Sequence, residues 1–557
     1  MQLGDSPQLR KQRGAFFTPY PIAEYLAEWA LRGATNGGVV LDPTCGEGVF
    51  LLAAANRLAA HERTGHLIGI DVHQPSLDET ADLLGDAGGS KVELLEGDFF
   101  NEARPDQLGA RLPYVDAVIG NPPFVRYQEH RGDARKRAAS AAFAQGVRLS
   151  GLASSWAALL VHSSAFLKPD GRIAMVLPAE LLSVGYAEPI RRWLRSRFQA
   201  VHLVLFEELQ FVDAEEQVVL LIARGTGGCN AFSLHHVRGA ADLSDRHVFD
   251  ADAFAPQATG KWTELLVQED ARGLLRTVLE TKFEPLSAVA RSELGTVTGG
   301  NSFFTMNEDT RLKYSLKEER DVIRTVPPGT RHVKGVTFTM AQWEQLRDQG
   351  DRVWLLYPKS DKKSAGLARY VDFGEANEVD KAYKCTIREP WWRPPVVSPP
   401  DMFFTYMSHV SPRLVRNEAD VTFLNSMHGV RLLTNPSAEL ADMYSILTLN
   451  TVTRLGAEIF GRSYGGGILK MEPTEAAQLP VPRRKYLDAA WAKLKKSRSR
   501  INSLIQEGAW DEATDLVDDV LLRQVSGVSN KDLAILSVAL KRTRLRRQRR
   551  SGDGKQG

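Results

Sequence analysis

A strand-like apolar run ends abruptly in residues that could do chemistry. The run covers residues 116–119 and soon passes into Asn121, Pro122, Pro123 and Phe124. Two adjacent prolines cannot continue a sheet ladder, so they end the strand and stiffen the backbone after it. The sequence therefore places an amide side chain, fixed carbonyl groups and an aromatic face together at the carboxyl end of a predicted strand.

A second segment, "VVLDPTCGEGVFLLAA" at residues 39–54, reads as a strand, a tight turn and a helix start. It lacks the G-x-G-x-x-G spacing of a dinucleotide site and carries Asp42, Pro43, Gly46 and Gly48 instead. Glycine lets a ligand approach the backbone, and a helix N-terminus suits a carboxylate, while Asp42 suits an amine. Amino and carboxylate groups together describe the methionine part of S-adenosylmethionine better than a pyrophosphate.

Two more carboxylates follow later predicted strands. Asp71 ends "GIDV", where it can accept hydrogen bonds from ribose hydroxyls. Asp98 in "EGDFF" can accept from an adenine amino group, with Phe99 or Phe100 as an apolar wall. Each carboxylate alone is more often a helix cap or a loop residue. Three in succession at strand ends, counting Asp42, favour a cofactor site.

These residues lie in a region, 39–223, where strand-like runs alternate with helical patterns. Seven runs are strand candidates: VVLD, LIGID, VELLEGD, DAVIGN, RIAMVLP, AVHLVLF and VVLLIA. The alternation is typical of a doubly wound α/β sheet with helices on both faces. The last two runs are too close for a crossover helix, so we expect them to pair antiparallel.

The pattern changes after about residue 235. A chain of 557 residues is too long for one core. Residues 236–484 hold aromatic, basic and proline-containing stretches without βα repeats, and residues 485–557 return to helical periodicity. We expect three domains: a catalytic domain over 1–235, a second domain over 236–484 and a helical extension over 485–557.

Composition is that of a globular protein, with 43% hydrophobic and 25% charged residues. No apolar run is long enough for a membrane span, and the first residues lack a signal-peptide core, so we expect a cytoplasmic protein. Cys45, Cys229 and Cys385 have no paired spacing, which predicts neither disulfides nor a metal site. Seven of residues 541–550 are cationic; a solvated tail and a nonspecific nucleic-acid contact are equally good interpretations.

The order "GAFFTPYPIAEYLAEWAL", "LDPTCGEG", "GIDV", "EGDFF", "GNPPF" resembles the S-adenosylmethionine-dependent N6-adenine DNA methyltransferases of type II restriction-modification systems, in the gamma arrangement. The resemblance covers residues 14–224 motif by motif. Residues 296–304 and 461–482 resemble the two ends of the family's target recognition domain more loosely. It implies a Rossmann-like class I methyltransferase fold with a doubly wound seven-stranded sheet, a mixed α+β target recognition domain and a C-terminal helical segment.

The family resemblance also implies roles for single residues. The side-chain carbonyl of Asn121 and the backbone carbonyl of Pro122 would accept the two protons of an adenine N6 amine, in a loop that Pro123 stiffens. Such an amine lies inside the duplex, so the base must be flipped out. Phe124 would stack on the flipped base, and Phe211 would pack on its other face, although an apolar loop anchor is an equal interpretation of Phe211.

The N-terminal segment of the chain resembles the family's N-terminal cofactor segment, and this resemblance implies that Thr18 and Pro19 lie beside the methionine part of the cofactor. The segment starts so near the N-terminus that we expect any cleavage to belong to a separate restriction endonuclease. The substrate would be double-stranded DNA, and the lack of an internal duplication is compatible with a monomer.

Two other functions stay open from the sequence. Protein glutamine and ribosomal RNA guanine methyltransferases also carry Asn-Pro-Pro-aromatic, but they usually place substrate-binding parts before the catalytic fold, whereas here the extra residues follow it. A noncatalytic DNA-binding subunit with this fold is the other alternative. The intact segments 42–48 and 121–124 argue against it.

Overall fold

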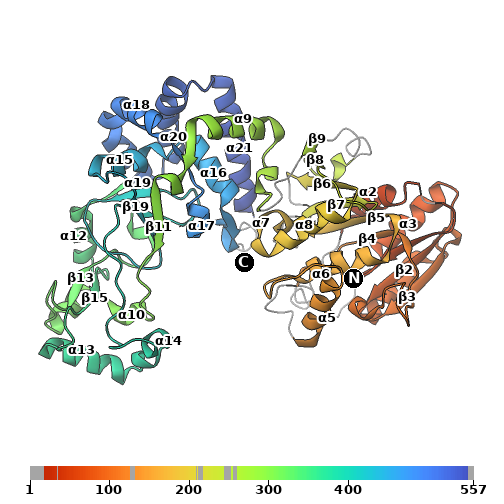
Figure 1. The fold of residues 1–557 in the computed structure, drawn as a ribbon, viewed down its shortest axis with the longest axis horizontal. Coiled ribbons are helices and arrows are strands. Elements are labelled where there is room, and N and C mark those ends of the chain that lie inside the picture. The colour runs from red at the N-terminus through yellow and green to blue at the C-terminus, as the bar shows by residue number, and fades with distance from the viewer. Residues whose placement is uncertain are drawn as a thin grey trace. The chain divides into compact units, whose positions relative to one another are not determined.

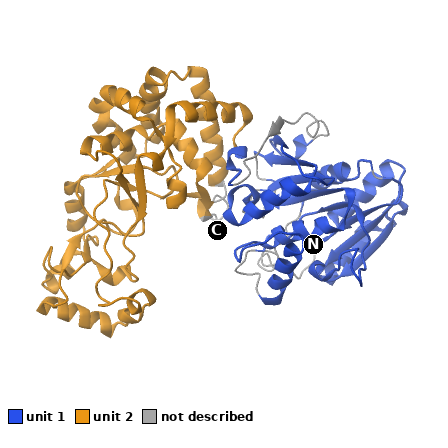
Figure 2. Cartoon of the chain, in the orientation of Figure 1, with its two compact units in different colours: residues 1–266 blue, residues 267–557 orange. Residues whose placement is uncertain are grey.

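The computed structural model describes residues 18–33, 35–125, 132–207, 210, 218–243, 252–254 and 260–549 (Figure 1). The chain divides into two compact units, residues 1–266 and 267–557 (Figure 2). This division differs from the expected boundaries at 235 and 484. The first unit extends beyond residue 235 because two strands, at residues 232–237 and 252–254, still pair in its sheet.

The first unit is built on one nine-stranded sheet with the order β3-β2-β1-β4-β5-β7-β6-β8-β9. Parallel pairs join β3 to β2, β2 to β1, β1 to β4 and β4 to β5. The strands are β1 Gly38–Asp42, β2 Gly65–Asp71, β3 Lys91–Glu96, β4 Val115–Gly120, β5 Leu167–Pro178, β6 Ala200–Phe206, β7 Val218–Arg224, β8 Phe232–Val237 and β9 Asp252–Phe254.

All seven predicted runs contain strands, and the antiparallel pairing predicted for the last two is confirmed because β7 runs antiparallel to β6. The expected total of seven strands is too low for this sheet. β8 pairs parallel with β6, and β9 pairs antiparallel with β8. The sequence "FSLHHV" of β8 carries two histidines and a serine, so it lacks the continuous apolar pattern that predicts a buried strand.

Helices cover both faces of this sheet, because successive strand residues point to opposite sides. Val40 and Ala117 face a core with α2 and α3, whereas Leu41 and Val118 face a second core with α6 and α8. The helices are α2 Tyr20–Ala30, α3 Val49–Ala60, α4 Gln74–Leu84, α5 Gly132–Phe143, α6 Ser155–Ser163, α7 Glu180–Ser183 and α8 Glu188–Arg197. This is the expected doubly wound arrangement.

The second unit mixes small sheets with helices. Its five-stranded sheet has the order β11-β19-β16-β18-β14, formed by Ala290–Leu294, His428–Leu432, Met402–Phe404, Leu414–Asn417 and Thr337–Phe338. Two three-stranded sheets are β12-β15-β13, from Thr305–Met306, Trp354–Leu356 and Val322–Arg324, and β17-β21-β20, from Met407–Ser408, Ile468–Lys470 and Arg462–Tyr464. β10 Phe283–Pro285 pairs with β22 Pro480–Pro482.

The helices after residue 484 form as predicted but share a core with earlier ones. Leu275 of α9, Leu455 of α16 and Leu521 belong to one buried cluster. The longer helices of this unit are α9 Glu269–Lys282, α12 Met340–Asp348, α13 Ala365–Ala376, α15 Ala438–Leu447, α16 Thr451–Phe460, α18 Arg484–Leu494, α19 Arg498–Glu507, α20 Trp510–Asp518 and α21 Asn530–Arg549. Aromatic side chains such as Phe403 and Trp392 lie in a separate core.

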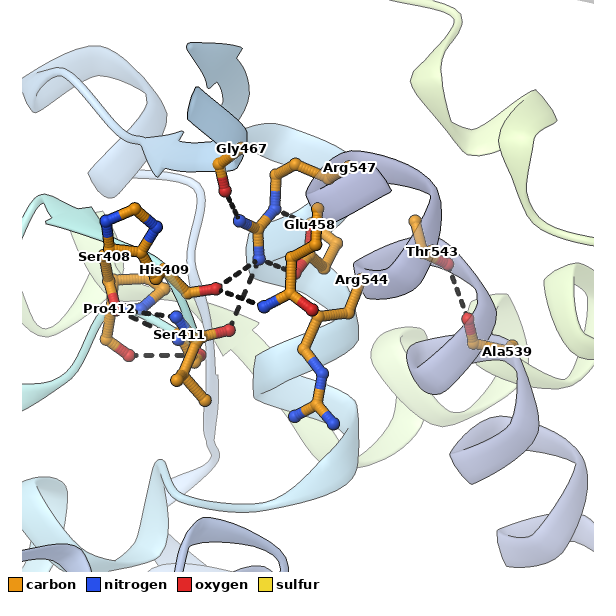
Figure 3. Close-up of polar contacts among 12 residues, drawn as sticks. Ser408, His409, Ser411, Pro412, Glu458, Gly467, Ala539, Thr543, Arg544 and Arg547 are labelled. Carbon is orange, nitrogen blue, oxygen red and sulfur yellow. Dashed lines mark hydrogen bonds and ion pairs between the residues drawn. The ribbon is translucent and has the colours of Figure 1, made fainter. Parts of the chain in front are cut away.

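The basic stretch at the end of the chain belongs to α21 and is partly structural. Arg547 forms a bidentate ion pair with Glu458 of α16, at 2.9 and 2.8 Å, and both side chains are buried (Figure 3). Arg547 also donates to the carbonyl groups of Gly467 and His409. Lys541 on the same helix is exposed. The stretch is therefore a packed helix with one solvated side.

Within the described ranges, no helix is both long and apolar enough to pass through a bilayer. The same residues contain no cluster of three His, Cys, Asp or Glu side chains placed to hold a metal ion.

Candidate active site

The predicted site residues follow the carboxyl ends of four neighbouring parallel strands, where ligands bind in open α/β sheets. Asp42 ends β1 and Asp71 ends β2, while Asp98 and Asn121 follow β3 and β4. Because these strands are hydrogen-bonded neighbours in the order β3-β2-β1-β4, all four residues lie along one edge of the sheet.

Asp42 is fully buried, and its Oδ1 accepts the Thr44 backbone N–H at 3.2 Å. Oδ2 accepts no hydrogen bond from the part of the chain that the structure describes. Burial raises the pKa of Asp42 to about 8; the Thr44 N–H opposes this shift and the nearby charge of Asp71 adds to it. A buried carboxylate with an open oxygen suits a cationic amine, whose charge would stabilise the ionised form.

The turn after β1 is held by the neighbouring strand end. The Gly46 N–H donates to Oδ2 of Asp71 at 2.9 Å, and Oδ1 of Asp71 accepts from the His73 N–H at 2.9 Å. Gly48 has φ of +79°, and a Cβ there would lie 2.5 Å from the side chain of Thr80. The turn therefore needs glycine, and Asp71 acts first as its anchor, with its remaining lone pairs available to ribose hydroxyls.

The helix that follows this turn begins without a side-chain cap. Pro43 is buried at the start of the turn, and Gly48 stands at the N-cap of α3 with no acidic residue in the first helical turn. The N–H groups of a first turn have no intrahelical acceptors. Such a terminus suits a ligand carboxylate. Together with Asp42 it fits the amino-acid end of S-adenosylmethionine.

At the end of the third strand, both carboxylate oxygens of Asp98 already accept hydrogen bonds from the protein. Oδ1 of Asp98 caps the short helix after β3 by accepting the Phe100 N–H at 3.0 Å, and Oδ2 accepts from Arg137 Nη2 at 2.9 Å. Phe99 is 2% exposed and packs on His162 and Phe166 in the core. An adenine would find Phe100, which is half-buried, as the available ring.

Asn121 is joined to the N-terminal segment. Its Nδ2 donates to Oγ1 of Thr18 at 3.2 Å, across 103 positions of sequence. Thr18 is buried, and Pro19 after it is the N-cap of α2, where its carbonyl accepts the Ile22 N–H at 2.9 Å. The family resemblance implies a place for Thr18 beside the cofactor, and the structure shows its side chain bonded to the amide of Asn121.

Gly120 brings the loop after β4 close to the turn after β1. A Cβ at Gly120 would lie 2.7 Å from Oδ1 of Asp42, so any larger residue would collide with this carboxylate. Asp42 therefore lies against the residue that precedes Asn121. Because the two predicted sites meet here, an amine substrate held by Asn121 and a donor held beside Asp42 would be neighbours.

Sequence reasoning missed Ser155, which fixes the loop after Asn121. Its hydroxyl donates to the carbonyl of Pro123 and accepts the Val125 N–H at 3.0 Å. The only signal was the serine pair before an apolar helix, which reads as an ordinary cap. Phe124 is half-buried and packs against both cores of the unit. Phe211, the other expected base-stacking residue, lies outside the described residues.

Comparisons with known proteins identify the family. Residues 5–224 match the family model N-6 DNA Methylase, and residues 259–522 match the C-terminal domain of the type II methyltransferase M.Eco57I. The chain is similar to type II methyltransferase M.AccI of Acinetobacter calcoaceticus, 23% identical over 84% of each chain. It is also similar to M.XamI of Xanthomonas campestris pv. amaranthicola, 24% identical over 86% of each chain.

Among solved structures, the type IIG restriction endonuclease BpuSI aligns with a TM-score of 0.46 and 14% identity, over 98% of this chain and 68% of that chain. The first family model matches residues of the first compact unit, and the second matches mainly residues of the second unit. Both models describe DNA methyltransferases. The chain belongs to the type II N6-adenine DNA methyltransferases of restriction-modification systems. Its cofactor is S-adenosylmethionine.

Proposed function

We propose that the loop 121–124 is the catalytic site of this methyltransferase and that Asp42, Gly46, Gly48 and Asp71 form its cofactor cradle. The observation that carries the proposal is the contact between the residue before Asn121 and the buried carboxylate of Asp42. It supports a donor and an acceptor site that lie side by side at one sheet edge.

The chemical problem is the weak nucleophilicity of an adenine amine, whose lone pair is delocalised into the ring. Two hydrogen-bond acceptors on the amino protons make the nitrogen more tetrahedral and aim its lone pair. Oδ1 of Asn121 and the carbonyl of Pro122 would be these two acceptors, and the bond from Nδ2 of the same amide to Thr18 supports this orientation of the amide. Bound S-adenosylmethionine supplies a methyl group on a sulfonium.

The two proline carbonyls of the loop have different surroundings. Ser155 holds the carbonyl of Pro123, whereas the carbonyl of Pro122 accepts no hydrogen bond from the residues that the structure describes. Pro122 therefore keeps an acceptor for the substrate amine. The prolines remove backbone freedom in advance, so little ordering is required at the moment of reaction.

Base flipping is the second part of the proposal. A target adenine would leave the duplex and stack on Phe124, with Phe211 on its other face. Stacking of this kind contributes about 1–3 kcal/mol per base, which offsets part of the unstacking cost.

For the whole chain, we propose the gamma order of segments. A seven-stranded class I methyltransferase core, β1–β7, would be extended by β8 and β9 and preceded by the N-terminal cofactor segment. Residues 1–235 would carry the catalytic function, with the remainder of β8 and β9 completing the sheet, while the rest of 236–484 would be the target recognition domain and 485–557 a helical extension. The protein would act on double-stranded DNA as a monomer and protect it from a separate restriction endonuclease.

The test is direct. The protein is incubated with radiolabelled S-adenosylmethionine and plasmid DNA, and the DNA is digested to nucleosides. We expect label in N6-methyladenine, and none in the Asn121→Ala variant. Asn101→Ala, which changes an exposed asparagine after β3, is the matched control and should label normally. Label in another nucleoside, in RNA or in protein would overturn the proposed substrate, and no label at all would point to the noncatalytic alternative.

A further inference from the structure

We propose that Ser155 is a positioning residue for methyl transfer: it holds the backbone of the catalytic loop in register, and Tyr186 supports it through Ser154. The inference rests on the proposed function of Asn121 and Pro122. It adds a residue at the start of α6 to the machinery, although α6 carries no group that would touch the substrate.

The first observation is the number of bonds between Ser155 and the loop. The hydroxyl donates to the Pro123 carbonyl and accepts from the Val125 N–H at 3.0 Å. The backbone N–H of Ser155 donates to the Val125 carbonyl at 3.1 Å. One residue thus fixes the peptides on both sides of Phe124, the first of which follows Pro123. Small shifts of these atoms would move the two acceptors of the substrate amine.

The second observation is that neither serine at the start of α6 uses its hydroxyl to cap the helix. Ser154 is the N-cap of α6, yet its side chain makes no capping hydrogen bond to the helix. A serine cap stabilises a helix by about 1 kcal/mol. Here the Ser154 hydroxyl donates to the Tyr186 hydroxyl oxygen at 3.1 Å instead, and the Ser155 hydroxyl turns to the loop. Helix stability alone does not explain this arrangement.

The third observation is a half-buried hydrogen-bond network behind the serines. Tyr186 donates to Oε2 of Glu180 at 2.6 Å, and Nε1 of Trp156 donates to the Tyr186 hydroxyl at 3.2 Å. Glu180 follows the carboxyl end of β5, the strand next to β4. The network therefore ties the start of α6 to the sheet edge that carries the catalytic loop.

The helix itself is a rigid support. All nine residues of α6 are buried, and His162 at its far end packs on Phe99 with ring centroids 4.8 Å apart. A buried helix cannot shift without disturbing its whole core. Atoms that hydrogen-bond to its first residue are held equally firmly, which is the preorganisation that the chemistry needs.

The test compares Ser155→Ala with Ser164→Ala, which removes a buried hydroxyl at the other end of the same helix. The Ser164 hydroxyl donates only within the helix region, to the Val161 carbonyl at 2.8 Å, so it reports the cost of losing a structural bond. Measurements are the single-turnover rate of methyl transfer, KM for S-adenosylmethionine and for DNA, and Tm.

For Ser155→Ala we expect the single-turnover rate to fall roughly tenfold or more, because displaced catalytic groups lose rate steeply. Both KM values should stay within about twofold. Ser164→Ala should keep the wild-type rate, and Ser155→Thr, which retains a hydroxyl, should recover most of the loss. A wild-type rate in Ser155→Ala, or an equal loss in Ser164→Ala, would overturn the inference.

If Ser155→Ala fails to fold, Tyr186→Phe provides the answer, since it removes the bonds to Ser154 and Glu180 but keeps the ring. We expect its rate to fall about threefold with unchanged KM, and no change would overturn the inference. Asn121→Ala, run in parallel, separates the two proposals. Turnover in Asn121→Ala would refute the proposed catalytic loop, whereas an inactive Asn121→Ala beside a fully active Ser155→Ala would refute only the role of Ser155.

Discussion

The amide of Asn121 is oriented by Thr18, whose Oγ1 accepts the Nδ2 hydrogen at 3.2 Å. The two residues are 103 positions apart, and Thr18 lies immediately before α2. Under the proposed function, this bond would give the N-terminal segment a role in orienting Asn121. With Nδ2 committed to Thr18, the amide presents Oδ1 on its other side, as the proposed acceptor for the substrate amine.

Thr18→Val should therefore reduce methyl transfer. Valine keeps the shape of threonine but offers no acceptor, so the Asn121 amide loses the bond that sets its direction. We expect kcat to fall about five- to tenfold, corresponding to roughly 1 kcal/mol for a lost hydrogen bond. Steady-state kinetics on plasmid DNA checks this, with Thr18→Ser as the control that retains the hydroxyl. Equal rates for the valine and serine variants would remove Thr18 from the orientation of Asn121.

Asn121→Ala should leave cofactor binding nearly unchanged and lower the methyl-transfer rate by about two to three orders of magnitude, as loss of a preorganised hydrogen-bonding group does elsewhere. The reason is that the transition state needs this acceptor more than the bound cofactor does. Calorimetry with S-adenosylmethionine and single-turnover assays separate the two effects. Similar rates in variant and wild type would contradict the proposed mechanism.

The buried carboxylate of Asp42 predicts a pH dependence of cofactor binding. Its pKa is raised to about 8 in the ligand-free protein, mainly by burial, so below pH 8 the group holds a proton. An ammonium group binds the ionised form, hence affinity should rise between pH 6 and 8 by up to about tenfold per pH unit and level off above 8. Calorimetry in buffers of different ionisation enthalpy would also detect the proton released on binding.

Asp42→Asn is the control for this titration, because it mimics the protonated form. It should bind S-adenosylmethionine weakly and without pH dependence over the same range.

The raised pKa of Asp42 also has a consequence for the stability of the folded protein. The folded state keeps the proton that the unfolded chain gives up near pH 3.8, so this group's contribution to stability is full below that pH and is lost as pH rises through 8. Stronger cofactor binding at pH 6 than at pH 8 would contradict the assignment.

Phe99 and Phe100 should respond differently to truncation. Phe99 is a core residue, so Phe99→Ala should lower the free energy of unfolding by about 3–5 kcal/mol. Phe100→Ala should leave stability closer to wild type and weaken binding of S-adenosylmethionine, since Phe100 keeps the accessible ring. Urea unfolding and calorimetry on both variants decide between them. A stable Phe99→Ala protein with weak cofactor binding would instead assign the contact with the adenine ring to Phe99.

Much of the first unit was predictable from the sequence, because parallel strands buried on both faces are continuous apolar runs and their ends carry the polar residues. Asp42, Asp71 and Asn121 could be placed on one edge for this reason. Contacts between distant side chains could not be predicted: neither the Arg137 ion pair of Asp98 nor the grip of Ser155 on Pro123 has a local signature. In the second unit the strands are mostly two to five residues long, too short for a period-two pattern.

The sequence left a solvated tail and a nonspecific nucleic-acid contact as alternatives for residues 541–550, and the structure adds a packing role for Arg547 of α21. Variants on the two sides of this helix should separate the packing role from a contact with DNA. Arg547→Met leaves Glu458 buried without its partner, which should cost about 3–5 kcal/mol of stability. Replacing the exposed Lys541 and Arg542 together by serine should leave Tm nearly unchanged. If that side of the helix contacts phosphates, the double variant should bind DNA more weakly and with a smaller salt dependence, whereas identical salt slopes would mean a merely solvated face. Thermal unfolding and fluorescence anisotropy with labelled duplex DNA at several salt concentrations measure both effects.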